Sequence, residues 1–131
     1  GCLMVRPKDE TGAVDSENPQ DMDDLLRMVG IETVDWSHKT ECCGASSLLC
    51  NPEISQIRIG EVLRQAYASG ADAVAVSCPV CHMNLEMTQT DERKIPVVYF
   101  TQLLGLALGC SAKDLELNKL LISFPWESKL K

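Results

Sequence analysis

Helical and strand-like patterns alternate along these 131 residues, and the alternation predicts a three-layer α/β domain with a mainly parallel sheet. Two further observations favour this class. The strand-like segments are short, and residues 71–77 are nearly all apolar, as in strands buried between two helical layers. An asparagine followed by proline, a helix-start signal, occurs twice before an amphipathic segment. The expected arrangement is Rossmann-like, with helices on both faces of the sheet.

The first half of the chain yields these elements in order. Residues 7–18 are polar and rich in turn-forming residues, which predicts a loop. Asn18 and Pro19 predict the start of a helix that Gly30 ends. Residues 31–36 alternate apolar and polar side chains like a strand, and residues 37–44 predict a loop.

The second half repeats the pattern. Asn51 and Pro52 predict a helix that Gly70 ends, followed by the strand 71–77 and a helix that begins at Pro79. Residues 95–100 predict another strand, and residues 101–109 a helix with Thr101 as its cap. In the tail, residues 112–117 predict a helical turn and residues 120–124 an extended segment.

We interpret the chain as a single domain, with its core at about residues 1–110 and a tail at 111–131. It begins Gly1-Cys2 without an initiator methionine or a signal peptide, so we expect a fragment of a longer chain. The expected sheet lacks its first strand, which would be central and would end just before Cys2. We expect residues 120–124 or a second chain to fill that gap.

Composition excludes several classes of protein. A hydrophobic share of 45% is typical of a folded domain, and a net charge of −7 argues against a nucleic-acid binder. No apolar run approaches the length of a membrane span. Seven cysteines without any sign of secretion indicate a reducing, cytoplasmic setting, where cysteines bind metals or carry out redox chemistry more often than they form disulfide frameworks.

The cysteines follow the predicted strands. Cys42 and Cys43 come after the strand 31–36, Cys78 comes directly after the strand 71–77, and Cys2 stands at the start of the chain. The carboxyl ends of parallel strands meet at one edge of a sheet, so we expect one shared site there.

Cys78 and Cys81 form a CxxC motif at a predicted helix start, where they share a face and where the helix dipole favours thiolates. By itself the motif is compatible with a redox dithiol, half of a metal site, or ordinary buried cysteines. The adjacent pair Cys42-Cys43 suits neither a disulfide, which would close a strained ring, nor a single tetrahedral ion, so the pair is either accidental or serves something larger than one ion. Five thiolates point instead to an iron–sulfur cluster, whose several iron atoms each take thiolates.

Four stretches then carry a family resemblance: "GC…RP", "KTECCGA", "VSCPVCHMNLE" and "IPVVYFTQLLGLALG". Together they resemble the cysteine-rich CCG domain, in particular the C-terminal of the two copies in the B subunit of CoB–CoM heterodisulfide reductase and its bacterial homologues. The resemblance runs from Cys2 to about Gly109. Leu3 departs from the family pattern, which often has histidine at this position, and the departure predicts weaker catalysis by this copy.

The resemblance implies an oxidoreductase subunit. In that family each complete motif holds a non-cubane [4Fe-4S] cluster that binds and cleaves a small disulfide with electrons from iron–sulfur and flavin partner subunits. The ligands carried over by position are Cys2, Cys42, Cys43, Cys78 and Cys81. The isolated fragment is not expected to turn over, and aerobic purification can leave its site empty.

Other relatives keep an alternative open. The domain also occurs in thiol-dependent fumarate reductases and in iron–sulfur subunits of glycolate, lactate and glycerol-3-phosphate oxidising enzymes, and some relatives bind zinc at this motif. A zinc-binding or electron-relay module that organises a subunit interface, without disulfide chemistry, is therefore the second hypothesis.

Five further residues lie near the motifs. His82 can donate a proton to a leaving thiolate, or it can cap the helix or hydrogen-bond a cluster sulfur. Lys39 and Arg6 can offset an anionic cluster or attract an anionic substrate, or they can be solvated surface charges. Cys50 and Cys110 are assigned no ligand role, and we expect Cys50 to be buried.

Overall fold

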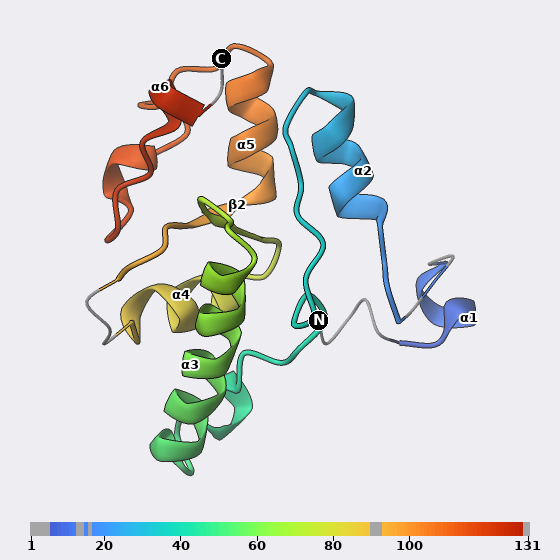
Figure 1. Cartoon of the computed structure of the whole chain (residues 1–131), viewed down its shortest axis with the longest axis vertical. Helices are drawn as coiled ribbons and strands as arrows, with labels where there is room; N and C mark the ends of the chain where they lie inside the picture. The colour runs from blue at the N-terminus through green and yellow to red at the C-terminus, as the bar shows by residue number, and fades with distance from the viewer. Residues whose placement is uncertain (1–5, 13–14, 16, 90–92, 130–131) are drawn as a thin grey trace.

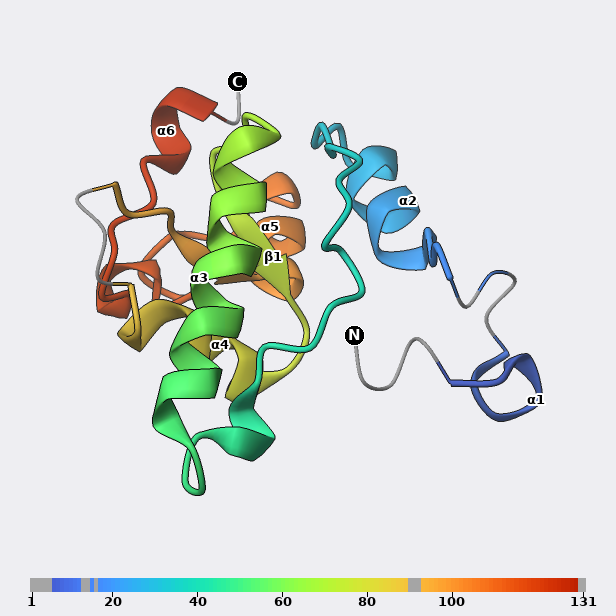
Figure 2. The ribbon, with the colours of Figure 1, turned by 60° about the horizontal axis from the view of Figure 1, so that its bottom comes forward.

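A two-stranded parallel sheet lies between two helical layers in the computed structural model, which describes residues 6–12, 15, 17–89 and 93–129. Figure 1 shows the elements along the chain, and Figure 2 shows β1 between α3 and α5. The helices and strands, in chain order, are α1 (Lys8–Thr11), α2 (Asp21–Met28), the 3₁₀ turn η1 (Ala45–Ser47), α3 (Pro52–Ala68), β1 (Val74–Val76), α4 (Pro79–Met87), β2 (Val97–Tyr99), α5 (Phe100–Ala107), the 3₁₀ turn η2 (Leu117–Lys119) and α6 (Trp126–Lys129).

The strand residues divide the core between the two faces of the sheet. β1 and β2 run parallel, with Val74 opposite Val97 and Val76 opposite Tyr99. Val74, Val76 and Val97 pack with α3 and α4 in a first core cluster. Val98 packs with α2, α5 and the tail in a second cluster, against which Ala73 and Ala75 also pack. The alternation of side chains along each strand therefore gives the predicted α/β class its three layers.

Most predicted elements of the second half are confirmed. Asn51 caps α3 by accepting a hydrogen bond from the Ile54 N–H at 3.4 Å, and Pro52 opens the helix. Gly70, with φ of +78°, follows its end. Both strands and the helix starting at Pro79 lie where the pattern predicts them. Local signals suffice here because caps, glycines and apolar runs all agree.

The first half differs in two ways. α2 begins at Asp21 rather than at Pro19, because the Asn18 side chain does not cap it. The Asn18 Oδ1 instead accepts hydrogen bonds from Gln20 Nε2 at 2.8 Å and from Lys39 Nζ at 3.4 Å. The predicted loop 7–18 contains the one-turn helix α1, which stands apart from the sheet and its helices (Figures 1 and 2).

The predicted helix cap at Thr101 is also wrong. α5 begins at Phe100, one residue earlier, so Thr101 lies inside its first turn. The residue before the helix is Tyr99, whose N–H donates to Gln102 Oε1 at 2.9 Å. A side chain three residues further on thus takes over the role expected of Thr101.

The segment 31–36 is extended but forms no ladder with any described strand, which corrects the prediction of a strand there. Its alternation still directs side chains to the core, since Ile31 packs against the second cluster and Trp36 against the first.

The expected extended segment 120–124 does not pair with a strand either. Leu120 and Phe124 pack in the second cluster, so the tail covers α5 instead of entering the sheet. Across the described ranges, no helix is both long and apolar enough to span a membrane.

Candidate metal centre

The CxxC motif lies where β1 passes into α4. Cys78 is the residue that precedes the helix, with extended backbone (φ −100°, ψ 127°), and Pro79 opens the first turn. The Cys78 carbonyl accepts the His82 N–H at 3.0 Å. This geometry places the Cys78 thiol beside the free N–H groups of the first turn, as the sequence predicts.

Cys43 reaches the same place from the loop between the segment 31–36 and α3. Its side chain is buried in the first core cluster. Its carbonyl accepts a hydrogen bond from Asn84 Nδ2 at 2.8 Å, and Asn84 is itself buried on α4. An ion pair between Glu41 and Arg58 ties the start of this loop to α3. The loop is therefore fixed against both helices of the first layer.

Three cysteines lie near one another at this point. Cys81 packs against the core cluster that contains Cys43, and both Cys43 and Cys78 are close enough to perturb its pKa. Hydrogen bonds from the backbone N–H of Cys81, and to a lesser degree of Val80, lower the pKa of the Cys78 thiol. Burial, together with the neighbouring thiols, raises the pKa of Cys81 to about 12. The thiolate form is thus favoured at Cys78, relative to an ordinary cysteine, and disfavoured at Cys81.

The remaining predicted ligands are placed differently. Cys42 is exposed, and its Sγ accepts the Gly44 N–H at 3.4 Å. Cys2 lies outside the described residues. Among the residues described, no group of three or more His, Cys, Asp or Glu side chains surrounds a common point in the manner of a metal site. The structure therefore brings Cys43, Cys78 and Cys81 near one another as a three-thiol group, and ligation by the predicted set stays a prediction.

Gly44 lets the chain turn directly after the cysteine pair. Its φ of +73° is left-handed, and a Cβ atom built there would lie 3.3 Å from the Ser55 Cα. We expect Gly44→Ala to lower the free energy of unfolding by more than Gly109→Ala does. Gly109 has a similar φ of +89° but open space around it, so its replacement costs only the backbone conformation, about 1–2 kcal/mol. Urea denaturation of both variants checks the difference, and equal losses would contradict a steric role for Gly44.

The two CxxC thiols are expected to differ in reactivity. Since the pKa of Cys78 is lowered and that of Cys81 is about 12, iodoacetamide should modify Cys78 of the metal-free chain near pH 8. Cys81 should stay unmodified until the pH approaches its raised pKa. Peptide mapping by mass spectrometry measures each site separately, and the denatured chain, in which both thiols should react alike, is the control. Faster modification of Cys81 than of Cys78 would contradict the assignment.

His82 is held on α4 by two contacts. Its ring stacks on Tyr99 with centroids 4.5 Å apart and planes 5° from parallel. Its Nδ1 lies 3.6 Å from Glu86 Oε2, and both side chains are largely buried. The Nε2 atom is buried without a hydrogen-bond partner among the described residues. Glu86 Oε1 accepts the N–H of Leu121 at 2.7 Å, which connects this helix to the tail.

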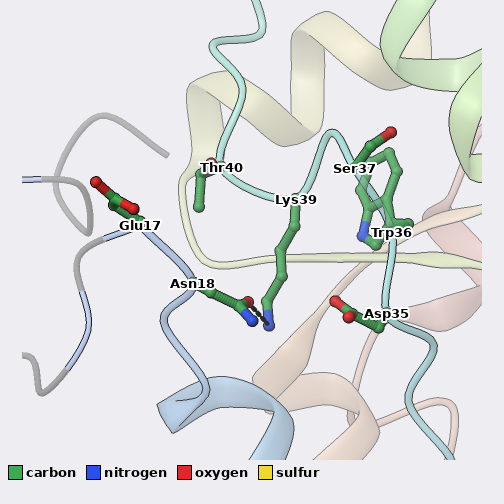
Figure 3. A pocket seen from close by; sticks show the side chains of 7 residues that line it. All are labelled: Glu17, Asn18, Asp35, Trp36, Ser37, Lys39 and Thr40. Atoms are coloured by element: carbon green, nitrogen blue, oxygen red, sulfur yellow. Dashed lines mark hydrogen bonds between the residues drawn. The ribbon is translucent and has the colours of Figure 1, made fainter.

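Lys39 has a structural contact rather than a free charge. Its Nζ lies 2.6 Å from Asp23 Oδ2 on α2, with both side chains mostly buried, and it also donates to Asn18. Figure 3 shows the Lys39 side chain directed at Asn18 across a pocket of about 420 Å³. Arg6 forms an exposed ion pair with Glu10 at 3.8 Å. The charge of Lys39 is therefore compensated within the protein.

Cys50 is exposed, so the expectation that it is buried is wrong. It precedes the Asn51 cap of α3, where the chain turns at the surface. Cys110 is also exposed. The assignment of no ligand role to either cysteine stays a prediction.

The first 86 residues match the family model of the CCG cysteine-rich domain, which is about two thirds of the chain. The chain belongs to the CCG cysteine-rich domain family. The match ends at Glu86, so it contains every predicted ligand and His82. The resemblance that the motifs predicted is confirmed.

Curated relatives are similar to this chain over nearly its whole length. The membrane anchor subunit of 8-methylmenaquinol:fumarate reductase of Wolinella succinogenes is 32% identical over 125 residues, which are 90% of this chain and 44% of the relative. The B subunit of the ferredoxin/F420H2-dependent CoB–CoM heterodisulfide reductase of Methanosarcina acetivorans is 30% identical over 130 residues, with coverage of 91% and 43%. The B subunit of the ferredoxin:CoB–CoM heterodisulfide reductase of Methanosarcina mazei is 30% identical over 128 residues, with the same coverage. The chain spans less than half the length of these relatives.

Sequence reasoning missed two residues of the CCG domain. Asn84, which fixes the Cys43 carbonyl, lies three residues after Cys81, on the same helix face. Glu86 lies four residues after His82, a spacing that places the two side chains together. Helical spacing from the motif residues was the available signal for both.

Proposed function

We propose that this CCG domain is part of an oxidoreductase subunit and that its cysteines hold a non-cubane [4Fe-4S] cluster for heterodisulfide-type redox chemistry. The observation that carries the proposal is that Cys43 lies near Cys78 and Cys81. Cys43 comes from the loop before α3, whereas Cys78 and Cys81 lie at the start of α4, far away in the sequence. Relatives whose names describe subunits of reductases support the redox role.

The donor set fits such a cluster. Thiolates are the ligands that iron–sulfur clusters take, and a bound metal deprotonates a coordinating thiol. The lowered pKa of Cys78 favours its thiolate, and the proton that Cys81 holds is released when a metal binds. Cys42, next to Cys43 and exposed, and Cys2 are the proposed further ligands. Asn84 and Gly44 hold the loop that presents the adjacent pair.

The proposed reaction is reduction of a small disulfide to two thiols, which takes up two electrons and two protons. The cluster would supply the electrons and a thiophilic surface. His82 is the proposed donor of one of the two protons, and solvent would supply the other. Tyr99 and Glu86 fix its ring, while Nε2 has no hydrogen-bond partner among the described residues. Partner subunits with iron–sulfur or flavin centres would deliver the electrons, in the reducing setting of the cytoplasm.

Anaerobic reconstitution of the chain with iron and sulfide, followed by metal analysis and electron paramagnetic resonance, tests the proposal. The expected result is about four iron atoms per chain and a paramagnetic signal in one oxidation state that shifts when a thiol is added. One zinc ion and no iron would contradict the cluster and favour the interface-organising module. Disulfide exchange that is lost in Cys78→Ser but kept in Cys2→Ser would instead identify a metal-free dithiol.

A further inference from the structure

One polar side chain interrupts the buried face of α3. Four of the buried residues of this helix are apolar and pack in the first core cluster, together with Cys43: Ile59, Val62, Leu63 and Ala66. The fifth is Ser55, whose exposed fraction is 0%. Because Ser55 lies one turn before Ile59, it continues the same helix face toward the start of α3.

The Ser55 hydroxyl lies beside the turn that follows the cysteine pair. A Cβ atom built on Gly44 would be 3.3 Å from the Ser55 Cα and 3.5 Å from its Oγ, so the loop and the helix are in close contact here. The Gly44 N–H in turn donates to Cys42 Sγ at 3.4 Å. Figure 2 shows this loop, in blue-green, beside the first turns of α3. The hydroxyl is therefore next to the part of the loop that presents two of the proposed ligands.

The Ser55 Oγ is buried and has no hydrogen-bond partner in the described part of the chain. A serine within a helix can donate to the carbonyl four residues earlier. The Asn51 carbonyl accepts the Ser55 N–H at 3.3 Å, but the hydroxyl makes no such bond. Leaving a buried hydroxyl unpaired is costly, and an unpaired one beside a proposed metal centre indicates an acceptor that comes with the metal.

A metal-bound cysteine sulfur is the acceptor that this position offers. The other buried residues of α3 are apolar, so the helix itself supplies no side-chain acceptor for Ser55 on this face. The sulfur of a thiol accepts hydrogen bonds weakly, whereas a metal-bound thiolate carries negative charge and accepts a stronger one. The adjacent cysteines before Gly44 would become such acceptors on binding a metal.

We propose that Ser55 is a positioning residue of the metal centre, whose hydroxyl donates a hydrogen bond to a metal-bound sulfur of the pair Cys42-Cys43. This inference rests on the proposed function, because it needs a metal on these cysteines. The bond would orient the sulfur and stabilise its negative charge. Hydrogen bonds to the sulfurs also set the reduction potential of an iron–sulfur cluster, and they raise it because the reduced form carries more negative charge. Ser55 would thus act on the centre from a helix that contains no ligand.

Ser55→Ala tests the proposal, because it removes the hydroxyl and nearly keeps the size of the side chain. The metal-free variant should unfold at the same urea concentration as the unmodified chain or at a higher one, since the lost hydroxyl has no partner there. After anaerobic reconstitution with iron and sulfide, its affinity for iron, measured by competition with a chelator, should fall by about tenfold or more. Its reduction potential should become more negative.

Ser46→Ala is the matched control. Ser46 lies in the 3₁₀ turn η1 of the same loop, and its side chain is exposed. This variant should match the unmodified chain in urea midpoint, iron affinity and reduction potential. A difference from the unmodified chain as large as that of Ser55→Ala would overturn the assignment to Ser55.

A spectroscopic readout separates the hydrogen bond from a packing role. Electron nuclear double resonance of the paramagnetic cluster detects protons that couple to the electron spin, and reconstitution in deuterium oxide identifies those that exchange. The unmodified chain and Ser46→Ala should show one exchangeable coupling that Ser55→Ala lacks. The same couplings in all three proteins would overturn the proposal.

Two further results would overturn the role of Ser55 and leave the proposed function intact. Equal iron affinity and reduction potential in Ser55→Ala and the unmodified chain would show that the hydroxyl does not act on the centre. A lower urea midpoint of metal-free Ser55→Ala would show that the hydroxyl is already bonded within the chain, for example to the Asn51 carbonyl. Failure of the unmodified chain to bind iron would instead contradict the proposed function itself, and this inference with it.

Discussion

Replacing Cys43 by serine is expected to remove most of the metal from the reconstituted CCG domain. Cys43 is buried, lies near Cys81 and is fixed through its carbonyl by Asn84. The weaker hydroxyl ligand of the variant would therefore stay at this position, and no other side chain has room to take its place. Removing an outer partner of a metal ligand commonly costs 10–100-fold in affinity, and we expect loss of the ligand itself to exceed about 100-fold. Iron content and the intensity of the paramagnetic signal per chain measure the effect.

Matched controls make this result specific. Cys50→Ser and Cys110→Ser change exposed cysteines away from the three-thiol group and should retain the full iron content. Asn84→Ala should lie between these controls and Cys43→Ser, because it frees the Cys43 carbonyl but keeps the thiol. Full iron content in Cys43→Ser, or equal losses in Cys50→Ser, would show that the three-thiol group is not the metal centre.

Replacing Lys39 by methionine is expected to cause a large loss of stability. The ion pair between Lys39 and Asp23 is mostly buried, and the substitution leaves the Asp23 carboxylate buried without its cation. Removing one partner of a buried pair typically costs about 3–5 kcal/mol. We expect a loss of that size in the free energy of unfolding, measured by urea denaturation monitored by circular dichroism.

Two further variants isolate the cause. The double variant Lys39→Met with Asp23→Leu should recover most of the loss, since replacing both charges by apolar groups removes the unpaired carboxylate. Lys119→Met removes the cation of an exposed pair with Glu116 and should change stability by no more than about 1 kcal/mol. A large loss in Lys119→Met, or no recovery in the double variant, would contradict the explanation.

The parts of the fold that could be predicted are those with agreeing local signals. α3 has an asparagine cap, a proline in its first turn and a glycine after its end, and β1 is an apolar run between turn residues. Cys43 does come near Cys78 and Cys81, as expected, but not for the expected reason, because the segment 31–36 joins no described ladder. Contacts of its loop with α3 and α4 place Cys43 there instead.

The parts that could not be predicted depend on contacts distant in sequence. Asn18 is of a residue type that commonly caps helices, but its side chain accepts hydrogen bonds from Gln20 and Lys39 instead. The segment 31–36 has strand-like alternation, yet a strand also needs a neighbour, and alternation does not reveal whether one is present. Lys39 lies in a predicted loop, where a charged residue is expected to be solvated. Its buried ion pair with Asp23 forms only because α2 packs beside that loop.

Glu86 bears on where this protein can be shortened. One of its carboxylate oxygens lies near His82, and the other accepts the N–H groups of Leu121 and Ile122 from the tail. Cutting the chain at Gly109, where the motifs end, would leave this buried carboxylate without its amide donors and would uncover α5. Cutting it at Glu86, where the family match ends, would remove β2 and α5 as well. A minimal version of the domain should therefore extend through Phe124, because the tail serves as a brace for the helix that carries Cys81.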